Sequence, residues 1–151
     1  MTVAIRPAVD TDIPWMLDEL RDFAQFYDSR HSLYPGDERA TAKMHDLIAN
    51  HFTLVAECDQ IWPVGFVAGL IVPHFMNEDV KVLTEALWWV CPHHRNGRAA
   101  LMLLNAFVAW GKANCDEVIF SAIEGKTNVK ESSFLKRGFR LAERSYAIEV
   151  G

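Results

Sequence analysis

The sequence predicts an α/β (α+β) protein in which helices cover both faces of a mixed β-sheet. Apolar residues recur at helical spacing over residues 13–24, 38–51 and 99–111, and short alternating or β-branched runs separate those segments. The resulting order is β α α β β β α β α β, and helices that follow single strands imply such a sheet. The chain has 151 residues, half of them hydrophobic, so we expect a single domain over 1–151 with a sizeable core.

The N-terminal third is predicted to contain an edge strand and two helices. Residues 2–8 form the strand, and the first helix follows with Pro14 in its first turn. Glu19 falls off the apolar stripe of that helix and is expected to face solvent. A polar, aromatic loop over 26–37 leads to the second helix, over 38–51.

Three strands are predicted in the middle of the chain. Residues 53–57 and 65–72 are rich in β-branched and apolar residues and are expected to pair as a hairpin. Pro73 to Asp79 contains turn-forming residues and is predicted to be a loop. Residues 80–90 then form a long strand that ends before Pro92, because proline cannot donate a hydrogen bond to a sheet ladder.

The C-terminal part is predicted to return to the sheet. Residues 117–123 alternate in polarity as a strand does. A short helix is expected over 128–137, ended by Gly138, since glycine commonly terminates helices. Residues 139–150 read as one or two further strands, and exposed aromatics there are consistent with a homodimer.

Composition and charge exclude several classes of protein. The net charge is −5 and the isoelectric point is near 5.6, which argues against broad nucleic-acid binding. The three cysteines are widely spaced and odd in number, which is typical of reduced thiols in a cytoplasmic protein. No apolar run approaches the roughly 20 residues that a membrane span requires. We therefore expect a cytoplasmic, globular protein without membrane association.

The segment from Thr84 to Gly111 predicts an anion-binding site. A buried aromatic strand ends at Pro92, a basic turn with one glycine covers 93–98, and a helix begins at Ala99. The first N–H groups of a helix lack internal partners, and the helix dipole favours negative charge beside them. The two arginines of the turn add local positive charge to an otherwise acidic chain.

This segment and the order of elements resemble the GNAT N-acetyltransferase superfamily over almost the whole chain. The family motif [Q/R]-x-x-G-x-[G/A] can be placed here in two ways. RNGRAA, 95–100, keeps the leading arginine but carries Arg98 where glycine is usual. HRNGRA, 94–99, keeps the glycine but begins with histidine. We favour the first placement, because Arg95 then follows Pro92 by three residues, as is common in the family.

The resemblance implies a mostly antiparallel sheet with a splay between its central strands, and acetyl-CoA as the cosubstrate. The diphosphate would rest on the N–H groups that begin the helix, and the pantetheine arm would extend the strand as a pseudo-strand. A family asparagine that opens the short downstream helix corresponds to Asn128. The implied cofactor-binding residues are Trp88, Trp89, Val90, Arg95, Asn96, Gly97, Arg98, Ala99, Ala100 and Asn128.

The resemblance also suggests catalytic residues, all for acetyl transfer to a primary amine. Glu85 is the first choice for the base, and a backbone N–H near Trp89 or Val90 would polarise the thioester carbonyl. The family often places a tyrosine acid in the short helix, where this chain has Phe134 and Leu135. Tyr146 or water would then protonate the leaving thiolate.

Alternatives remain open at several positions. His94 is a second candidate for the acid or base.

Cys91, His93 and His94 are not expected to form a metal site, because neighbouring residues point in different directions and no further cluster completes four ligands. The side chains of both tryptophans are expected to be core, with the backbone contacting the cofactor.

Acceptor selection is assigned to the loop over 26–37. Five of its polar side chains could contact an unidentified amine, either a small molecule or a protein: Asp28, Arg30, His31, Tyr34 and Asp37. One alternative function is a catalytically weak CoA-binding or protein-interaction module. Another is an acetyltransferase that acts on charged transfer RNA, which requires a basic face that the acidic composition does not favour.

Overall fold

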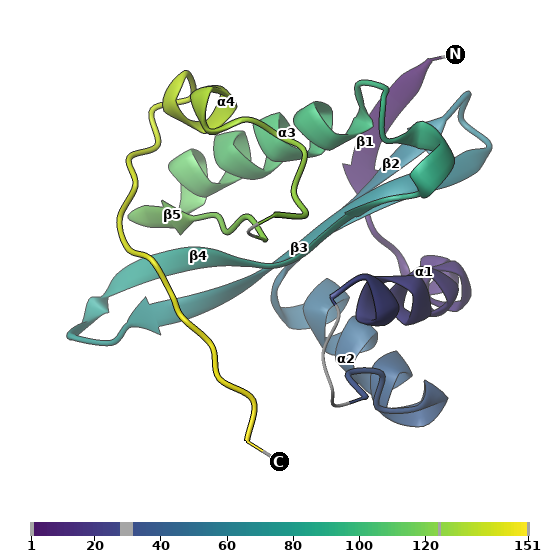
Figure 1. Cartoon of the computed structure of the whole chain (residues 1–151), viewed down its shortest axis with the longest axis horizontal. Helices are drawn as coiled ribbons and strands as arrows, with labels where there is room; N and C mark the ends of the chain where they lie inside the picture. The colour runs from purple at the N-terminus through teal and green to yellow at the C-terminus, as the bar shows by residue number, and fades with distance from the viewer. Residues whose placement is uncertain (1, 28–31, 124, 151) are drawn as a thin grey trace. The chain divides into compact units, whose positions relative to one another are not determined.

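A computed structural model describes residues 2–27, 32–123 and 125–150. The chain divides into two compact units, Met1–Phe120 and Ser121–Gly151. The first unit holds the whole β-sheet and three of the α-helices (Figure 1). A single domain over 1–151 therefore stays a prediction, and each unit is treated by itself.

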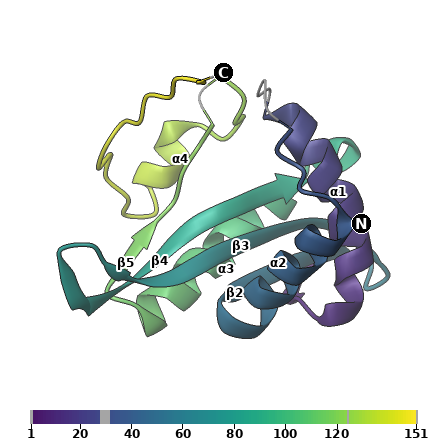
Figure 2. The same cartoon turned by 90° about the horizontal axis from the view of Figure 1, so that it is seen from below.

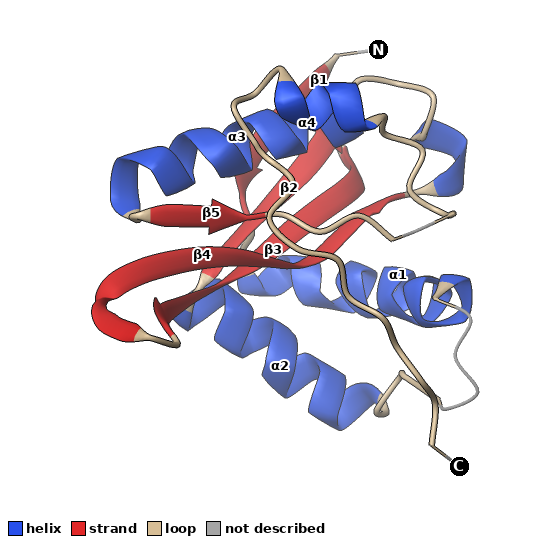
Figure 3. Ribbon diagram, turned by 60° about the vertical axis from the view of Figure 1, so that its left-hand side comes forward, coloured by secondary structure: helices blue, strands red, loops and turns tan. Residues whose placement is uncertain are grey.

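The sheet of the first unit has five strands in the order β1-β2-β3-β4-β5. The first four pair antiparallel, whereas β5 runs parallel to β4 (Figure 3). This confirms the predicted mixed, mostly antiparallel sheet. The strands are β1 (Val3–Pro7), β2 (Phe52–Cys58), β3 (Trp62–His74), β4 (Asn77–Val90) and β5 (Glu117–Ile119).

Helices cover both faces of this sheet, as predicted. The helices of the first unit are α1 (Ile13–Phe26), α2 (Asp37–Asn50) and α3 (Ala99–Asn114), with short 3₁₀ turns η1 (Asp10–Asp12) and η2 (Pro92–His94). Figure 2 shows α1 and α2 on one side of the strands and α3 on the other. Each face has its own core, because side chains alternate along a strand: Phe66 packs with α1 and α2, and the adjacent Val67 packs with α3.

The hairpin of β3 and β4 is longer than predicted. The loop expected over 73–79 is wrong, since β3 continues to His74 and β4 begins at Asn77. Backbone pairing between these two strands does not require apolar side chains, so polar, exposed residues extend the ladder beyond the core. Phe75 and Met76 form the tip and are 99% and 84% exposed.

The C-terminal elements are shorter than predicted. β5 ends at Ile119 and α4 spans Glu131–Leu135. Gly138 follows that helix with φ +88° and donates its N–H to the Leu135 carbonyl, as expected for a terminating glycine. The strands predicted over 139–150 are wrong, since none of the described residues of this segment is in a strand. The segment is rich in apolar and aromatic residues, but a strand also needs a neighbouring backbone to pair with. None of the helices in the described residues has both the length and the apolar character that a membrane span requires.

Two partly buried ion pairs that share one arginine join β1, η1 and β2. Both terminal nitrogens of Arg6 donate to the Asp12 carboxylate at 2.8 Å, and Arg6 Nε donates to Glu57. Asp12 is 7% exposed and also accepts the Val9 N–H at 2.8 Å. Burial alone would raise the pKa of the Asp12 carboxyl, but the bonds from Arg6 and Val9 outweigh it and lower that pKa.

Asp12 should therefore stabilise the fold at neutral pH and lose this effect in acid. A carboxyl with a lowered native pKa contributes stability above its unfolded pKa, and that contribution disappears as the pH falls through the native pKa. We expect the free energy of unfolding, measured in urea from about pH 6 to about pH 3, to fall more steeply for the wild type than for Asp12→Asn. Asp18→Asn, at an exposed carboxylate, is the control and should keep the wild-type slope. Equal slopes for wild type and Asp12→Asn would contradict this role.

Gly111 fixes the spacing between α3 and β5. A Cβ at this position would lie 2.4 Å from Val118 Cγ2 and 3.1 Å from Leu83 Cδ2. Alanine usually stabilises a helix by about 1 kcal/mol relative to glycine. Here we expect Gly111→Ala to lower the free energy of unfolding by about 1–3 kcal/mol, because the site is overpacked. Val118→Ala removes the clashing methyl, so the double variant should show a smaller loss than the sum of the single variants in denaturant unfolding.

Candidate functional site

The paired stretch of β4 and the edge strand β5 is short. Their parallel pairing covers Val82–Thr84 against Glu117–Ile119, and β5 then ends. β4 continues to Val90, so its C-terminal half extends past β5. The predicted splay would lie between these two strands, where their pairing ends. An extended ligand can add to such a strand through main-chain hydrogen bonds.

A β-bulge marks the start of this C-terminal half. Ala68 pairs with Leu87 and Gly69 pairs with Glu85, so Ala86 is an extra residue in β4. Bulges bend a strand and re-aim the neighbouring side chains, and they are frequent beside active sites. Glu85, the predicted base, is half-buried next to this bulge. The opposing Gly69 has no room for a side chain, since a Cβ there would lie 2.6 Å from Phe107 Cε2.

The carbonyl group of Val90, the last residue of β4, points away from β3. The Cys91 N–H donates to the Val64 carbonyl of β3 at 2.8 Å. The N–H and C=O of one peptide point in opposite directions, so the Val90 carbonyl faces the side of the sheet where β5 lies. This carbonyl accepts a hydrogen bond from Arg95 Nε at 2.9 Å.

Arg95 lies against aromatic rings of β4 and α1. Its guanidinium carbon is 4.3 Å from the ring centroid of Trp89 and 5.1 Å from that of Phe26. Both distances are within the range of cation–π attraction. The Arg95 side chain therefore bonds to the end of β4 through Nε, and a bond to a phosphate would have to come from its terminal nitrogens.

Trp89 is a core residue, as predicted, and it is 5% exposed. Its ring packs edge-on against Phe23 and Phe26 of α1, with centroids 5.6 Å and 5.4 Å away. Its Nε1 donates to Glu19 at 2.7 Å. Trp88 is half-buried and meets Phe120 edge-on at 4.8 Å.

Glu19 is the residue of this site that sequence reasoning missed, and its predicted solvent-facing position is wrong. It lies on α1 and bonds to the buried Trp89 indole. The available signal was spacing: Glu19 is three residues after Met16 and four before Phe23, which places it on the inward stripe.

The turn after β4 leads to an uncapped helix N-terminus. The Gly97 N–H bonds to the His94 carbonyl, and the first helical bond of α3 runs from the Met102 N–H to the Arg98 carbonyl. Arg98 occupies the N-cap position and is exposed, and its side chain makes no capping bond. The amides that begin α3 therefore point outward without an internal acceptor, as an anion site requires.

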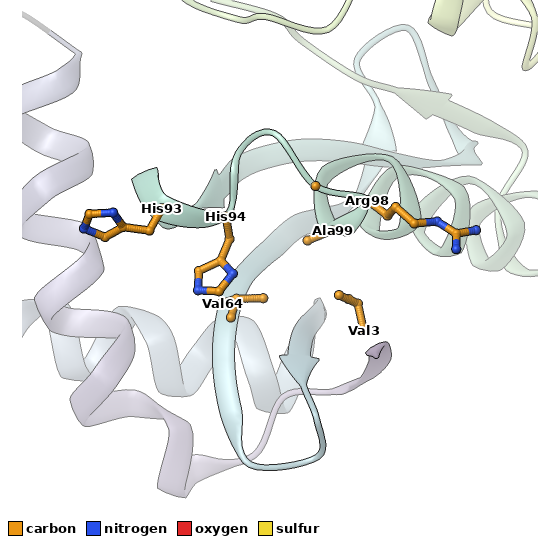
Figure 4. Close-up of a pocket in the computed structure, with 7 residues that line it drawn as sticks. Val3, Val64, His93, His94, Arg98 and Ala99 are labelled. Carbon is orange, nitrogen blue, oxygen red and sulfur yellow. The ribbon is translucent and has the colours of Figure 1, made fainter. Parts of the chain in front are cut away.

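A hollow of about 80 Å³ lies beside this helix start (Figure 4). His94 lies next to Val64 in it, and Arg98 extends away from both (Figure 4). The hollow is lined by Val3, Val64, His93, His94, Gly97, Arg98 and Ala99. Ligand pockets for larger molecules reach about 300–1,000 Å³, so this space fits a small group of a ligand, with the remainder outside.

Cys91 is not poised as a nucleophile. Burial and the neighbouring Glu19 carboxylate raise the pKa of its thiol to about 12, so it is uncharged at neutral pH. No group of three or more histidine, cysteine or acidic side chains gathers as a metal site among the residues that the structure describes.

Two other predicted site residues, Asn128 and Tyr146, belong to the second unit, so their roles stay predictions. In the predicted acceptor loop, Tyr34 Oη and Arg21 both donate to Asp37 at 2.6 Å. These bonds hold the described end of the loop to α1. The other three loop residues of that prediction, Asp28, Arg30 and His31, lie outside the described residues.

Comparisons with known proteins point to one family. The model of the Acetyltransferase (GNAT) family matches residues 16–139. Among solved structures, a ribosomal-protein-alanine N-acetyltransferase from Brucella melitensis biovar Abortus 2308 is similar at a TM-score of 0.73 and 18% identity, over 99% of this chain and 100% of that chain. A comparison with curated proteins found no match.

Two of the similar structures contain the coenzyme. A predicted acetyltransferase with acetyl-CoA from Clostridium acetobutylicum has a TM-score of 0.71 and 16% identity, over 98% of this chain and 96% of that chain. An aminoglycoside N-acetyltransferase in complex with CoA has a TM-score of 0.71 and 20% identity, over 99% and 95%. At these identities, the likeness establishes a shared fold.

Proposed function

Because this chain belongs to the GNAT family of acetyltransferases, we propose that it transfers an acetyl group from acetyl-CoA to a primary amine by direct attack. The observation that carries the proposal is the uncapped start of α3, placed directly after the bulged half of β4 that extends past β5. The first feature suits a diphosphate and the second suits an extended amide-containing arm.

The cofactor would use backbone more than side chains. Its diphosphate would lie on the N–H groups between Asn96 and Ala100, apart from that of Gly97, which already donates to His94. Gly97 would allow close approach, and Arg98 would add charge. The pantetheine arm would run along Trp88 to Val90. Asn128 is proposed to contact the cofactor from the second unit.

The reaction requires a neutral amine and a polarised thioester. The amine nitrogen would attack the carbonyl carbon, and the C–S bond would then break to release coenzyme A. Strand alternation turns the N–H of Val90 to the same side as its carbonyl, which favours Val90 over Trp89 as the oxyanion donor. Glu85 would take the proton from the amine, directly or through water, and Tyr146 or water would protonate the thiolate.

A catalytically weak CoA-binding or protein-interaction module is the second candidate. It is favoured by Arg98 at the usual glycine position and by Phe134 and Leu135 where the family often has a tyrosine. Calorimetry with acetyl-CoA and a turnover assay on an amine panel separate the two. Binding without turnover would support the module.

Arg98→Ala tests the anion site. We expect the dissociation constant for CoA, measured by calorimetry, to rise about five- to tenfold, since one charge-assisted bond to a phosphate is lost at an exposed position. Arg39→Ala removes an exposed arginine of α2 and should leave binding unchanged. An unaltered dissociation constant for Arg98→Ala would take this side chain out of the cofactor site.

Glu85→Gln tests the base. Turnover should fall more at about pH 7 than at about pH 9.5, because the amine loses its proton without help as the pH approaches its own pKa. Glu78→Gln, at an exposed position on the same strand, should keep the wild-type pH profile. The same loss for Glu85→Gln at both pH values would argue against proton transfer through Glu85.

A further inference from the structure

Arg95 lies at the centre of contacts between α1, the end of β4 and the turn before α3. We propose that Arg95 is a positioning residue, which holds the end of β4 in place for the pantetheine arm, and that its side chain contributes little to phosphate binding. This inference rests on the proposed function and assigns a distinct task to one residue of the same site.

The hydrogen bond of Arg95 is directed at the strand. Its Nε donates to Val90 O, on the side of β4 that extends past β5. A carbonyl oxygen has two lone pairs, so Val90 can still accept a bond from a ligand amide while Arg95 holds it. The bond therefore orients this carbonyl without blocking it.

The guanidinium of Arg95 lies near aromatic rings from two elements. Phe26 is the last residue of α1, and Trp89 is the residue before Val90. Because Arg95 lies near both rings, it joins the end of α1 to the end of β4. The same α1 residue, Phe26, borders the loop to which acceptor selection is assigned.

Trp89 is also held by a hydrogen bond from its indole nitrogen. The indole Nε1 donates to Glu19, and the charges of both Glu19 and Arg95 act on the Cys91 thiol. Arg95 and Glu19 therefore both lie near Cys91, and both contact Trp89. Together these two contacts hold Trp89, the residue before Val90, in place.

The two halves of coenzyme A should respond differently to loss of this side chain. The nucleotide half needs the amides that begin α3 and the Arg98 side chain, and Arg95 holds neither of these. The pantetheine half needs the Val90 backbone in a set orientation. Without Arg95 the cofactor itself would have to order the end of β4, which costs affinity.

The experiment measures binding of CoA and of 3′-phospho-ADP, its nucleotide half, by calorimetry. For Arg95→Ala we expect about tenfold weaker CoA binding and 3′-phospho-ADP binding within about twofold of wild type. Arg98→Ala is the matched variant and should weaken both ligands. Arg95→Lys keeps the charge but lacks the planar group, so it should behave like Arg95→Ala.

Three results would overturn the positioning role: equal weakening of both ligands by Arg95→Ala, full rescue by Arg95→Lys, or unchanged CoA binding. Phe26→Leu removes a ring partner and keeps the arginine, so it should reproduce the selective loss if Arg95→Ala fails to fold. Unaltered CoA binding by Phe26→Leu would also count against the proposal. If the wild type binds neither ligand, the proposed function itself fails.

Discussion

The structure depends on one constraint: β4 continues for several residues beyond the end of its pairing with the parallel strand β5. Backbone N–H and C=O groups must be satisfied, and an ordinary central strand uses both of its sides for this purpose. Here the parallel pairing with β5 stops at Thr84, while the antiparallel pairing with β3 continues to Val90. Residues of β4 belong to the apolar cores on both faces of the sheet, so hydrogen-bonding backbone lies where packing is rigid. A site built on such a strand is held more firmly than one built on loops.

Much of the first unit could be predicted from local pattern. Continuous apolar runs identified the buried strands, and helical spacing identified α1, α2 and α3. Each of these elements buries the side chains that recur at its own period. The predictions that were wrong depend on a partner elsewhere in the chain. Residues 139–150 contain apolar and aromatic residues that suit a strand, but pairing depends on another backbone, which composition does not specify. Glu19 was misplaced for a related reason: a carboxylate on an inward stripe is unexpected unless its indole donor, far along the chain, is known.

The site divides in the same way. The turn and the helix start could be predicted because they are contiguous: Pro92 ends the strand, and α3 begins at Ala99 as expected. The direction of the Arg95 side chain could not be predicted. It depends on the ring of Phe26 in α1 and on the Val90 carbonyl, which points away from β3. The bulge at Ala86 could not be predicted either, because it is a property of the register between two strands.

The glycine near the far end of α3 has a mechanical consequence. With hydrogen in place of a methyl at Gly111, the helix rests directly on Val118 and Leu83. The C-terminal end of α3 therefore cannot move closer to β5, and no larger residue fits between them. The first turn is anchored by Ala99, which is buried in the same core. Both ends of the helix are thus seated on the sheet, so the amides at its start keep a constant height above the strands.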